Sequence, residues 1–308
     1  TLRAVGQTFG AFTKSHTAQL YEGTVTYTHA PRSPNGMSWW LRAGRQVLSW
    51  HEMRLQGHRL FRPNGLTHDG LRFRGFSGNW RVDGFAGYPG DGDRPFAALR
   101  FGHKGKMSMG ALTADAVYVR DGVSWSDAIR HTFGVYAKLK RGPMSARLES
   151  YGQVGKVKGT DVTAMMVSTL LTYTAGRWTG GFHADYLSGD EPGKPRGSGT
   201  FDVLHGGLHP FYGQFDVAYR LIGGRSAGRG LIDGGLRGVF KDGPWRVRAR
   251  ASHLHFADFS QLGADLNLDV GYRFGPQSWL VLASAALVRP DKDVMKLVYV
   301  MYGFTLRP

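Results

Sequence analysis

The chain has 308 residues, of which 42% are apolar, 45 are glycine and none is cysteine. The lack of cysteine excludes disulfides, cysteine zinc sites and cysteine nucleophiles, and no run of about 18 apolar residues offers a transmembrane helix. The formal net charge of +16 suits a nucleic acid, an anionic lipid or an anionic solute as partner. Because the chain starts at Thr1 rather than Met, we expect a processed, exported protein.

Alternation of apolar and polar residues runs through the whole chain. It predicts about sixteen strands of about 10–14 residues, with turn residues between them. Helical periodicity is scarce, although the sequence allows a short turn of helix within 50–60. The predicted strands are 2–12, 18–30, 37–47, 66–76, 78–88, 95–104, 107–120, 128–140, 143–154, 162–174, 177–188, 229–240, 244–256, 261–274, 277–287 and 294–306.

The segment 261–274 shows the alternation most clearly, with one apolar and one polar parity. At about 14 residues it exceeds the about 5–6 of a typical soluble strand and covers the about 9–11 that a tilted strand needs to cross a bilayer. We therefore expect its apolar face to meet lipid and its polar face to line water. The expected lipid-facing residues are Leu262, Leu266, Leu268 and Val270, and the expected lumen-facing residues are Asp265, Asn267 and Asp269.

The connections between the predicted strands alternate in length. Short turns at one rim and long loops at the other are the pattern of outer-membrane barrels. An even number of strands then places both termini on the short-turn side, provided that the strand-like segment 205–225 is a hairpin outside the wall. The longer connections are 48–65, 89–94, 121–127, 155–161, 189–228, 257–260 and 288–293.

We therefore predict an all-β fold, a transmembrane antiparallel β-barrel of about 16 strands (16–18) with short periplasmic turns and long extracellular loops. Residues 1–308 would form this single domain, with long loops at 48–65 and 189–228. The alternative is a soluble all-β protein, such as a propeller or a pair of sandwiches. It is disfavoured because the polar parity of most strands carries Arg, Asp, Lys, Ser, Thr and Gly, which can line water but cannot fill a dry core.

Rows of cations on the polar parity are the candidate functional feature. Arg246, Arg248 and Arg250 alternate with apolar residues on one strand. Arg on the lipid face costs about 2–4 kcal/mol at mid-depth, so we expect these residues to face the lumen and favour anions. The same alternation selects Arg72, Arg74, Arg81 and Arg147. Alternatively, carboxylates across the lumen neutralise the cations, which then only stiffen the wall. The available carboxylates are Asp83, Glu149, Asp185, Asp265 and Asp269.

The loop 48–65 is a second candidate region. Arg42 and Arg45 lie just before it and Arg54 lies within it. If the loop folds into the pore, these cations lie at a constriction. If it lies on the surface, they have no such role, and the sequence leaves both alternatives open.

Other motifs carry little chemistry. His51-Glu52-Met53-Arg54 lacks the second histidine of a zinc motif, and His253 and His255 have no third ligand, so we expect no metal. The acidic residues at 90–93 suit a turn better than calcium. The Gly-x-Ser-x-Gly match at 224–228 lacks the strand and helix of a nucleophile elbow. We expect neither an enzyme nor a cofactor.

Several segments share their residues with one known family. LRAGRQVLSWHEMRLQG at 41–57 and GLTHDGLRFRG at 65–75 contain a Gly-Arg-Gln strand, an Arg-containing loop and an Asp-Gly strand. WRVDGFAG at 80–87 and LGADLNLDVGYRF at 262–274 fit further strands, and 186–216 holds a Ser-Gly-Asp loop followed by Thr-Phe-Asp. In these motifs the chain resembles the alginate-export-type outer-membrane porins.

The resemblance implies a monomeric barrel with an Arg-rich lumen that passes an anionic polysaccharide or another anionic solute. This chain is shorter than the best-known member of that family. Carried over by position, the lumen or constriction residues would be Arg42, Arg45, Arg54, Arg72 and Arg74.

The predicted function is that of a channel (a porin) in the bacterial outer membrane, which passes an anionic solute such as an acidic polysaccharide or oligosaccharide. In the alternative, the barrel is structural or binds envelope proteins, and its own loops plug it. A soluble protein that binds nucleic acid is disfavoured because the aromatic residues mostly lie on the parity opposite the arginines. Outer-membrane lipid is the expected partner of the outer face.

Overall fold

The computed structural model describes residues 2–9, 17–31, 36–58, 65–90, 94–123, 128–207, 211, 228–275, 278–290 and 294–304. Within them, sixteen antiparallel strands form one sheet in chain order. The strands are β1 (Leu2–Phe9), β2 (Thr17–His29), β3 (Ser38–Gln46), β4 (His68–Ser77), β5 (Trp80–Pro89), β6 (Phe96–Met107), β7 (Gly110–Val123), β8 (Ala128–Arg141), β9 (Met144–Val157), β10 (Thr160–Ala175), β11 (Trp178–Leu187), β12 (Leu231–Asp242), β13 (Trp245–His255), β14 (Gln261–Arg273), β15 (Ser278–Val288) and β16 (Met295–Phe304). In this described part of the chain, no helix is long and apolar enough to cross a membrane.

Each predicted strand has an observed counterpart with ends that differ by at most three residues, which confirms the all-β antiparallel prediction. The prediction of a long connection at 155–161 is wrong. There β9 and β10 continue to a two-residue turn of Lys158 and Gly159, whose φ angles of 52° and 81° match the twist of a tight hairpin. The segment 205–225 lies mostly outside the described residues. Residues 51–52 form a turn rather than the helix allowed within 50–60.

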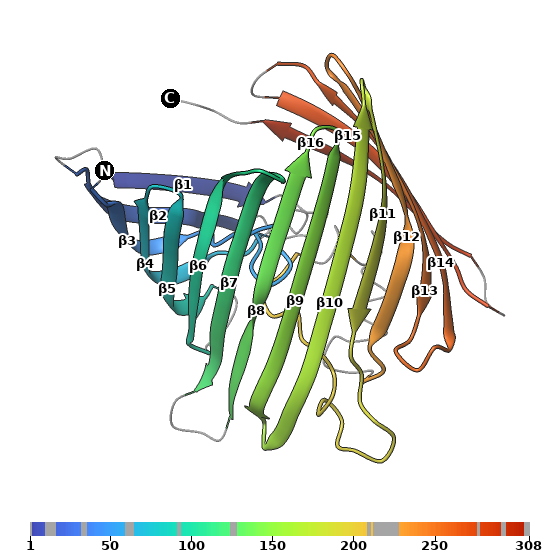
Figure 1. Ribbon diagram of the computed structural model, residues 1–308, viewed down its shortest axis with the longest axis horizontal. Coiled ribbons are helices and arrows are strands. Elements are labelled where there is room, and N and C mark those ends of the chain that lie inside the picture. The colour runs from blue at the N-terminus through green and yellow to red at the C-terminus, as the bar shows by residue number, and fades with distance from the viewer. Residues whose placement is uncertain are drawn as a thin grey trace.

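The sheet bends into the wall of a barrel (Figure 1). Even-numbered strands end at the mostly short connections and odd-numbered strands at the mostly longer ones, so the start of β1 and the end of β16 lie on the short-turn side, as predicted. In the described residues β1 pairs with β2 and β16 pairs with β15. Pairing of β1 with β16, which would close the ring, is not among these described pairs.

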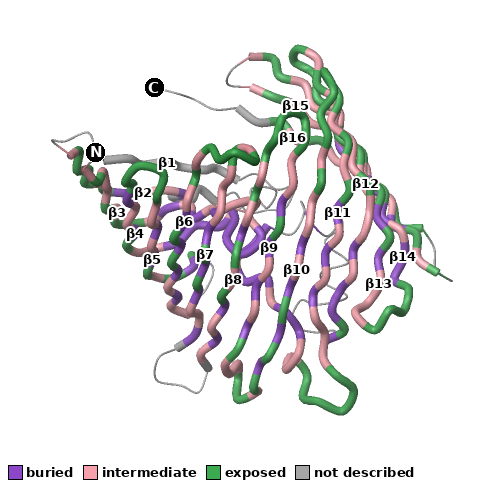
Figure 2. The backbone as a smooth tube through the Cα atoms, viewed as in Figure 1, coloured by how far each residue is buried: buried purple, intermediate pink, exposed green. Residues whose placement is uncertain are grey.

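The outward face of the sheet is apolar, whereas inward residues are mostly buried or half-buried (Figure 2). Exposed outward residues include Leu71, Phe133, Leu171, Leu236 and Val298. Aromatic pairs gather near the short-turn ends: Tyr27 with Trp39, Trp80 with Phe101, Trp178 with Phe240 and Trp245 with Tyr272. An apolar band bordered by aromatic residues is what a barrel presents to lipid.

The register predicted for β14 holds except at its start. Leu266 is exposed and Asp265 is buried, as predicted, but Leu262 is 2% exposed and belongs to the interior. A bulge at Gly263, with φ of 151°, causes the difference, because it inserts an extra residue and reverses the parity before it. A Cβ at this glycine would lie 2.3 Å from the carbonyl oxygen of Val288. By the same register Leu268 and Val270 share the outward face, and Asn267 and Asp269 the inward face.

Parts of two connections pack against the inner face of the curved sheet, residues 47–58 and 200–207. They meet at a parallel bridge between Gln56 and His205. Their fully buried side chains include Leu48, Trp50, Gln56, Phe201 and Val203. The described residues of the loop 48–65 therefore lie inside the curved sheet, as the first alternative expects, whereas a constriction at this loop stays a prediction.

Candidate functional site

The inner face of β13 changes character along the strand. From the short-turn end, its inward residues are Arg246, Arg248, Arg250, Ser252 and Leu254. The first two are exposed, the Arg250 side chain is 11% exposed and Leu254 is 1% exposed. The lumen accordingly has a cationic end at the short turns, an ion-pair layer in the middle and an apolar layer at the long loops.

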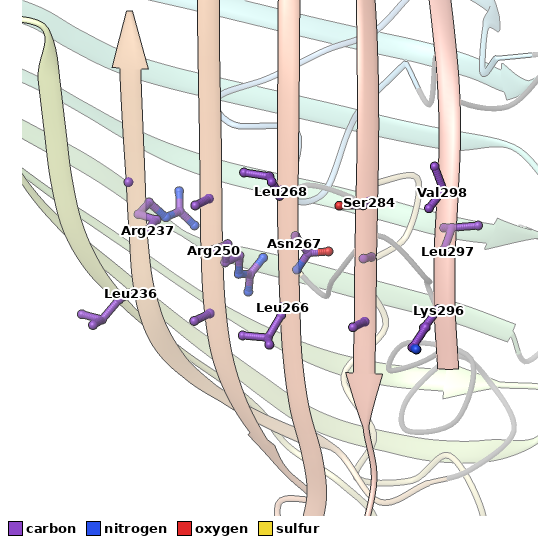
Figure 3. Close-up of a pocket in the computed structure, with 15 residues that line it drawn as sticks. Leu236, Arg237, Arg250, Leu266, Asn267, Leu268, Ser284, Lys296, Leu297 and Val298 are labelled. Atoms are coloured by element: carbon purple, nitrogen blue, oxygen red, sulfur yellow. The ribbon is translucent and has the colours of Figure 1, made fainter. Parts of the chain in front are cut away.

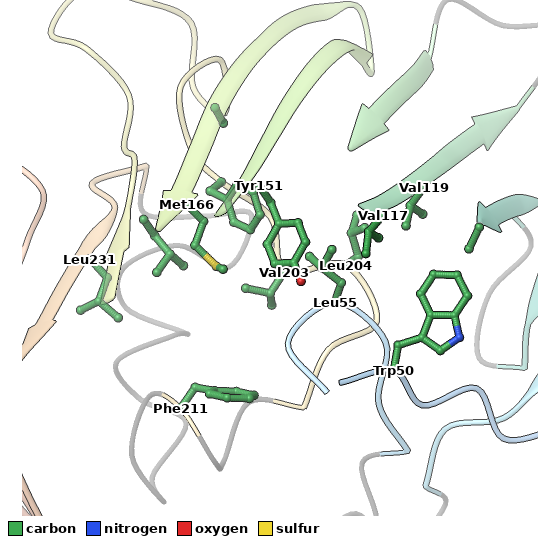
Figure 4. Packing of buried hydrophobic residues seen from close by; sticks show 14 of the residues in the cluster. Trp50, Leu55, Val117, Val119, Tyr151, Met166, Val203, Leu204, Phe211 and Leu231 are labelled. Atoms are coloured by element: carbon green, nitrogen blue, oxygen red, sulfur yellow. The ribbon is translucent and has the colours of Figure 1, made fainter. Parts of the chain in front are cut away.

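The apolar layer joins strands and loops in one cluster. Val119 of β7, Met166 of β10 and Leu231 of β12 are buried together with Leu55 and Val203 from the two loops (Figure 4). This end departs from the expected water-lined interior. Because the loops cover it, apolar side chains can turn inward there without contacting water.

In the ion-pair layer, the buried carboxylate of Asp83 on β5 accepts hydrogen bonds from three arginines. Arg72 donates from Nε and Nη2 at 2.9 and 2.8 Å, Arg74 from Nε at 2.9 Å, and Arg100 from Nη2 at 2.9 Å. The Arg100 guanidinium also lies 5.3 Å from the ring of Trp50 in the inner loop. One carboxylate facing three guanidinium groups leaves this part of the wall with a positive balance.

Asp115 of β7 connects the inner loop to the wall. Its carboxylate accepts a hydrogen bond from Arg81 Nε at 2.9 Å and lies 2.8 Å from His51 Nε2 of the loop. The His51 ring stacks on Tyr136 of β8, with ring centres 4.1 Å apart. A polar contact and a ring contact therefore hold the same loop residue.

Glu52 makes a further contact between the loop and β8. It accepts hydrogen bonds from Lys138 Nζ at 3.1 Å and from the Tyr136 hydroxyl at 3.3 Å. Burial raises the pKa of the Glu52 carboxyl, but these partners lower it by more, so its pKa lies below the ordinary value. Glu52 is therefore charged at neutral pH.

Arg54 reaches from the inner loop to β10 and β11. Its guanidinium donates to Asp185 Oδ2 at 2.9 Å and to Ser168 Oγ at 2.6 Å, and Ser168 donates in turn to Asp185 Oδ1 at 2.6 Å. Arg147 also donates to Ser168 Oγ at 3.1 Å and pairs with Glu149 at 3.2 Å. All five residues are buried, so this network ties the loop to the wall.

Asp233 of β12 is the acceptor for the innermost arginine of β13. It pairs with Arg250 and lies 3.1 Å from His183 Nε2 of β11. Arg250 also donates to Ser252 Oγ at 2.9 Å and to the Phe211 carbonyl oxygen at 2.5 Å. The carboxylate that neutralises Arg250 thus comes from the neighbouring strand β12, and it is not one of the carboxylates named from the sequence.

The cationic end has more cations than carboxylates. Arg248 pairs with Asp269 at 2.9 Å, but the side chain of Arg246 makes no hydrogen bond or ion pair within the described part of the chain. By register, Lys241 stands directly opposite Arg246 on the same face. The inward-facing cations near the short turns that lack an ion pair in the described residues are Lys104, Lys106, Lys140, Lys241, Arg246 and Arg273.

No protein-family model matches the chain, and no curated protein matches it in sequence. Solved structures do match. OccK2 (OpdF) of Pseudomonas aeruginosa aligns with 94% of this chain and 82% of its own, at a TM-score of 0.60 and 13% identity. The fold is that of an outer-membrane porin.

Other porins of Pseudomonas aeruginosa support this fold. OccD3 (OpdP) covers 94% of this chain and 79% of its own length, with a TM-score of 0.60 and 10% identity. OpdK with vanillate covers 86% and 76%, with a TM-score of 0.54 and 13% identity. At such identities the likeness shows the porin fold alone. The structures named here are of Occ porins, so the resemblance to the alginate-export type is not shown.

Within this porin fold, most of the predicted arginines face the interior: Arg42, Arg54, Arg72, Arg74, Arg81, Arg147, Arg246, Arg248 and Arg250. Arg45 does not. It shares the parity of the exposed Leu41 and pairs with Asp69 at 2.7 Å on the outward face. The prediction was wrong because Arg45 lies three positions after the inward Arg42, and an odd spacing puts two residues on opposite faces of a strand.

Some interior cations were missed. Arg100 lies between the exposed Leu99 and Phe101, so the alternation rule applied to β6 would have found it. Arg130 of β8 pairs with Asp121 and with Asp202 of the second loop, at 2.8 and 3.0 Å. No local sequence pattern predicts the contact of Arg130 with Asp202, because it joins segments far apart in the chain.

The remaining motifs stay without a chemical role. His253 and His255 lie within 3.0 Å of one another, and no group of three metal-ligating side chains exists among the described residues. Residues 91–93 of the acidic loop and 224–227 of the Gly-x-Ser-x-Gly match lie outside the described part.

Proposed function

We propose that the protein is a channel of the bacterial outer membrane that favours anionic solutes. The observation that carries the proposal is the set of inward cations at the short-turn end that make no ion pair with any residue the structure describes, with Arg246 and Lys241 opposite each other. Alternate residues of a strand lie about 6.6–6.8 Å apart, within the Debye length of about 8 Å at physiological salt, so the fields of Arg246 and Arg248 overlap. Such a field raises the local concentration of anions.

The solute we favour is an organic anion, such as an acidic oligosaccharide or polysaccharide or a smaller carboxylate. Guanidinium groups bind carboxylates through two parallel hydrogen bonds. In support, one porin of similar fold, OpdK, is described with vanillate, a carboxylate anion. The long-loop end would then act as the constriction, because the two inner loops pack there.

The second candidate is a barrel that its own loops keep plugged, with a structural or partner-binding role in the envelope. The apolar layer favours it, because a dry cluster offers a charged solute no water. In both cases the outward apolar band contacts outer-membrane lipid, and neither role requires catalysis or a cofactor.

Conductance in a planar lipid bilayer tests the proposal. The channel predicts discrete current steps on insertion of the folded protein, with a reversal potential in a KCl gradient that indicates anion preference. Folded, inserted protein without current would support the plugged barrel, and cation preference would refute the proposed selectivity.

A further inference from the structure

Strands β12–β16 carry a pocket of about 540 Å³, and most of the residues that line it face outward (Figure 3). By register, two outward rows cross these five strands. One row consists of Leu236, Ala251, Leu266, Ala286 and Lys296, and the other of Gly238, Ala249, Leu268, Ser284 and Val298. Small residues on β13 and β15 thus alternate with large residues on β14 and β16.

This alternation makes two grooves that run along the strands. Ala249 and Ala251 form the floor on β13, and Ser284 and Ala286 form the floor on β15. The floors lie two strands apart, about 10 Å. Leu266 and Leu268 of β14 stand between the two floors and are about half exposed. Grooves parallel to the strands suit hydrocarbon chains, which run across the bilayer in roughly the same direction.

Lys296 lies at the side of the β15 groove. It is exposed on the outward face, and its amino group points toward the long-loop end in Figure 3. It stands opposite Ala286, two residues (about 6.6–6.8 Å) from Val288, where the β15 ladder ends at the long loops. Lys296 makes no ion pair with any described residue. A lysine on a lipid-facing wall is unfavourable unless it reaches the interface or meets an anion.

We propose that this pocket binds an acylated, phosphate-bearing lipid of the outer leaflet, with acyl chains in the two grooves and a phosphate on Lys296. The proposal adds a lipid site to the outer wall and rests only on the outer-membrane location, not on conduction. The Ser284 hydroxyl lies in the β15 groove and can donate to an ester or amide oxygen of the lipid. At the mouth of the β13 groove lie His253 and Gln261, 3.2 Å apart and exposed, which offer further hydrogen bonds to a polar headgroup.

The test is retention of lipid by the purified protein in non-ionic detergent, measured by native mass spectrometry. The probes are a diphosphorylated, multiply acylated glucosamine disaccharide and its dephosphorylated form. We expect the wild type to retain the phosphorylated probe about tenfold more strongly than the other, as one charge-assisted contact allows. Lys296→Gln should abolish this preference, and Ala286→Phe, which fills the groove, should reduce retention of both probes.

The matched control is Lys156→Gln, because Lys156 belongs to another wall and has a carboxylate neighbour, Asp161, at 3.8 Å. This variant should behave as wild type. Equal retention of the two probes by the wild type, or an unchanged preference in Lys296→Gln, would overturn the proposal. All variants are compared as folded protein, and no current is recorded. A negative result for the lipid site therefore does not affect the channel proposal, and a protein that passes no current could still bind the lipid.

Discussion

Arginines at the short-turn end of the lumen and arginines in the ion-pair layer have opposite environments. At the short-turn end Arg246 is exposed and makes no ion pair among the described residues, whereas deeper inside Arg54 is 2% exposed and bound to Asp185 and Ser168. A buried, paired cation contributes little field and holds structure in place, but an exposed cation without a carboxylate can act on a passing ion. The number of arginines in the lumen therefore says less about selectivity than their partners do.

The largest expected effect is a loss of stability when a cation is removed from the ion-pair layer. Arg54→Met leaves the Asp185 carboxylate buried without its cation, so the free energy of unfolding should fall by about 3–5 kcal/mol. Denaturant unfolding in detergent, followed by tryptophan fluorescence, measures this change. The control is Arg177→Met, whose exposed pair with Asp242 should be worth about 0–1 kcal/mol. Equally small losses in both variants would contradict a structural role for the ion-pair layer.

The same substitution should also change conduction. Because Arg54 ties the inner loop to β10 and β11, its loss should release the loop and raise the mean single-channel current. An unchanged current in folded Arg54→Met would show that the loop does not limit the path.

A smaller effect is expected at the bulge that turns Leu262 into the apolar layer. Gly263→Ala places a Cβ 2.3 Å from a backbone oxygen at φ of 151°, which should cost about 1–3 kcal/mol of the free energy of unfolding. Gly238→Ala is the matched substitution, since a Cβ there meets no atom within 4 Å. If thermal unfolding shows equal losses for both glycines, the bulge is not the strained element that the register indicates.

The smallest expected effect is the pH response of Glu52. Its pKa is lower in the folded protein than the ordinary value of 4.5, so its contribution to the free energy of unfolding is fully present above pH 4.5. The contribution should disappear as the pH falls below 4.5 through the folded-state pKa. Glu52→Gln should remove this part of the acid dependence, as measured by melting temperature between pH 3 and pH 6 (about the range in which carboxyls titrate). Identical pH profiles would show that the Lys138 contact adds no stability.

Much of the wall could be predicted from the sequence, because successive side chains of a strand point to opposite faces of the sheet. Alternation located the strands and placed Arg72, Arg147 and Arg250 inside. It failed at Leu262, where a bulge changed the parity. The prediction for Arg45 was wrong for another reason, because it followed chain position and resemblance instead of parity.

Contacts between segments far apart in the chain could not be predicted from the sequence. The bridge of Gln56 with His205 joins two loops, and the pair of Arg130 with Asp202 joins a strand to a loop, and no local pattern connects these segments. The apolar layer exists only because these loops cover it. The alternation therefore predicted which residues point inward, but not which of them would be dry.

The central claim is that exposed cations at the short-turn end make the lumen favour anions. The most direct measurement is the reversal potential of single channels in a KCl gradient, for wild type and the double variant Arg246→Gln, Arg248→Gln. Arg45→Gln, on the outward face, is the control. We predict anion preference in wild type and in Arg45→Gln, and a clear shift toward cations in the double variant. Cation preference in wild type, or an unshifted potential in the double variant, would contradict the account.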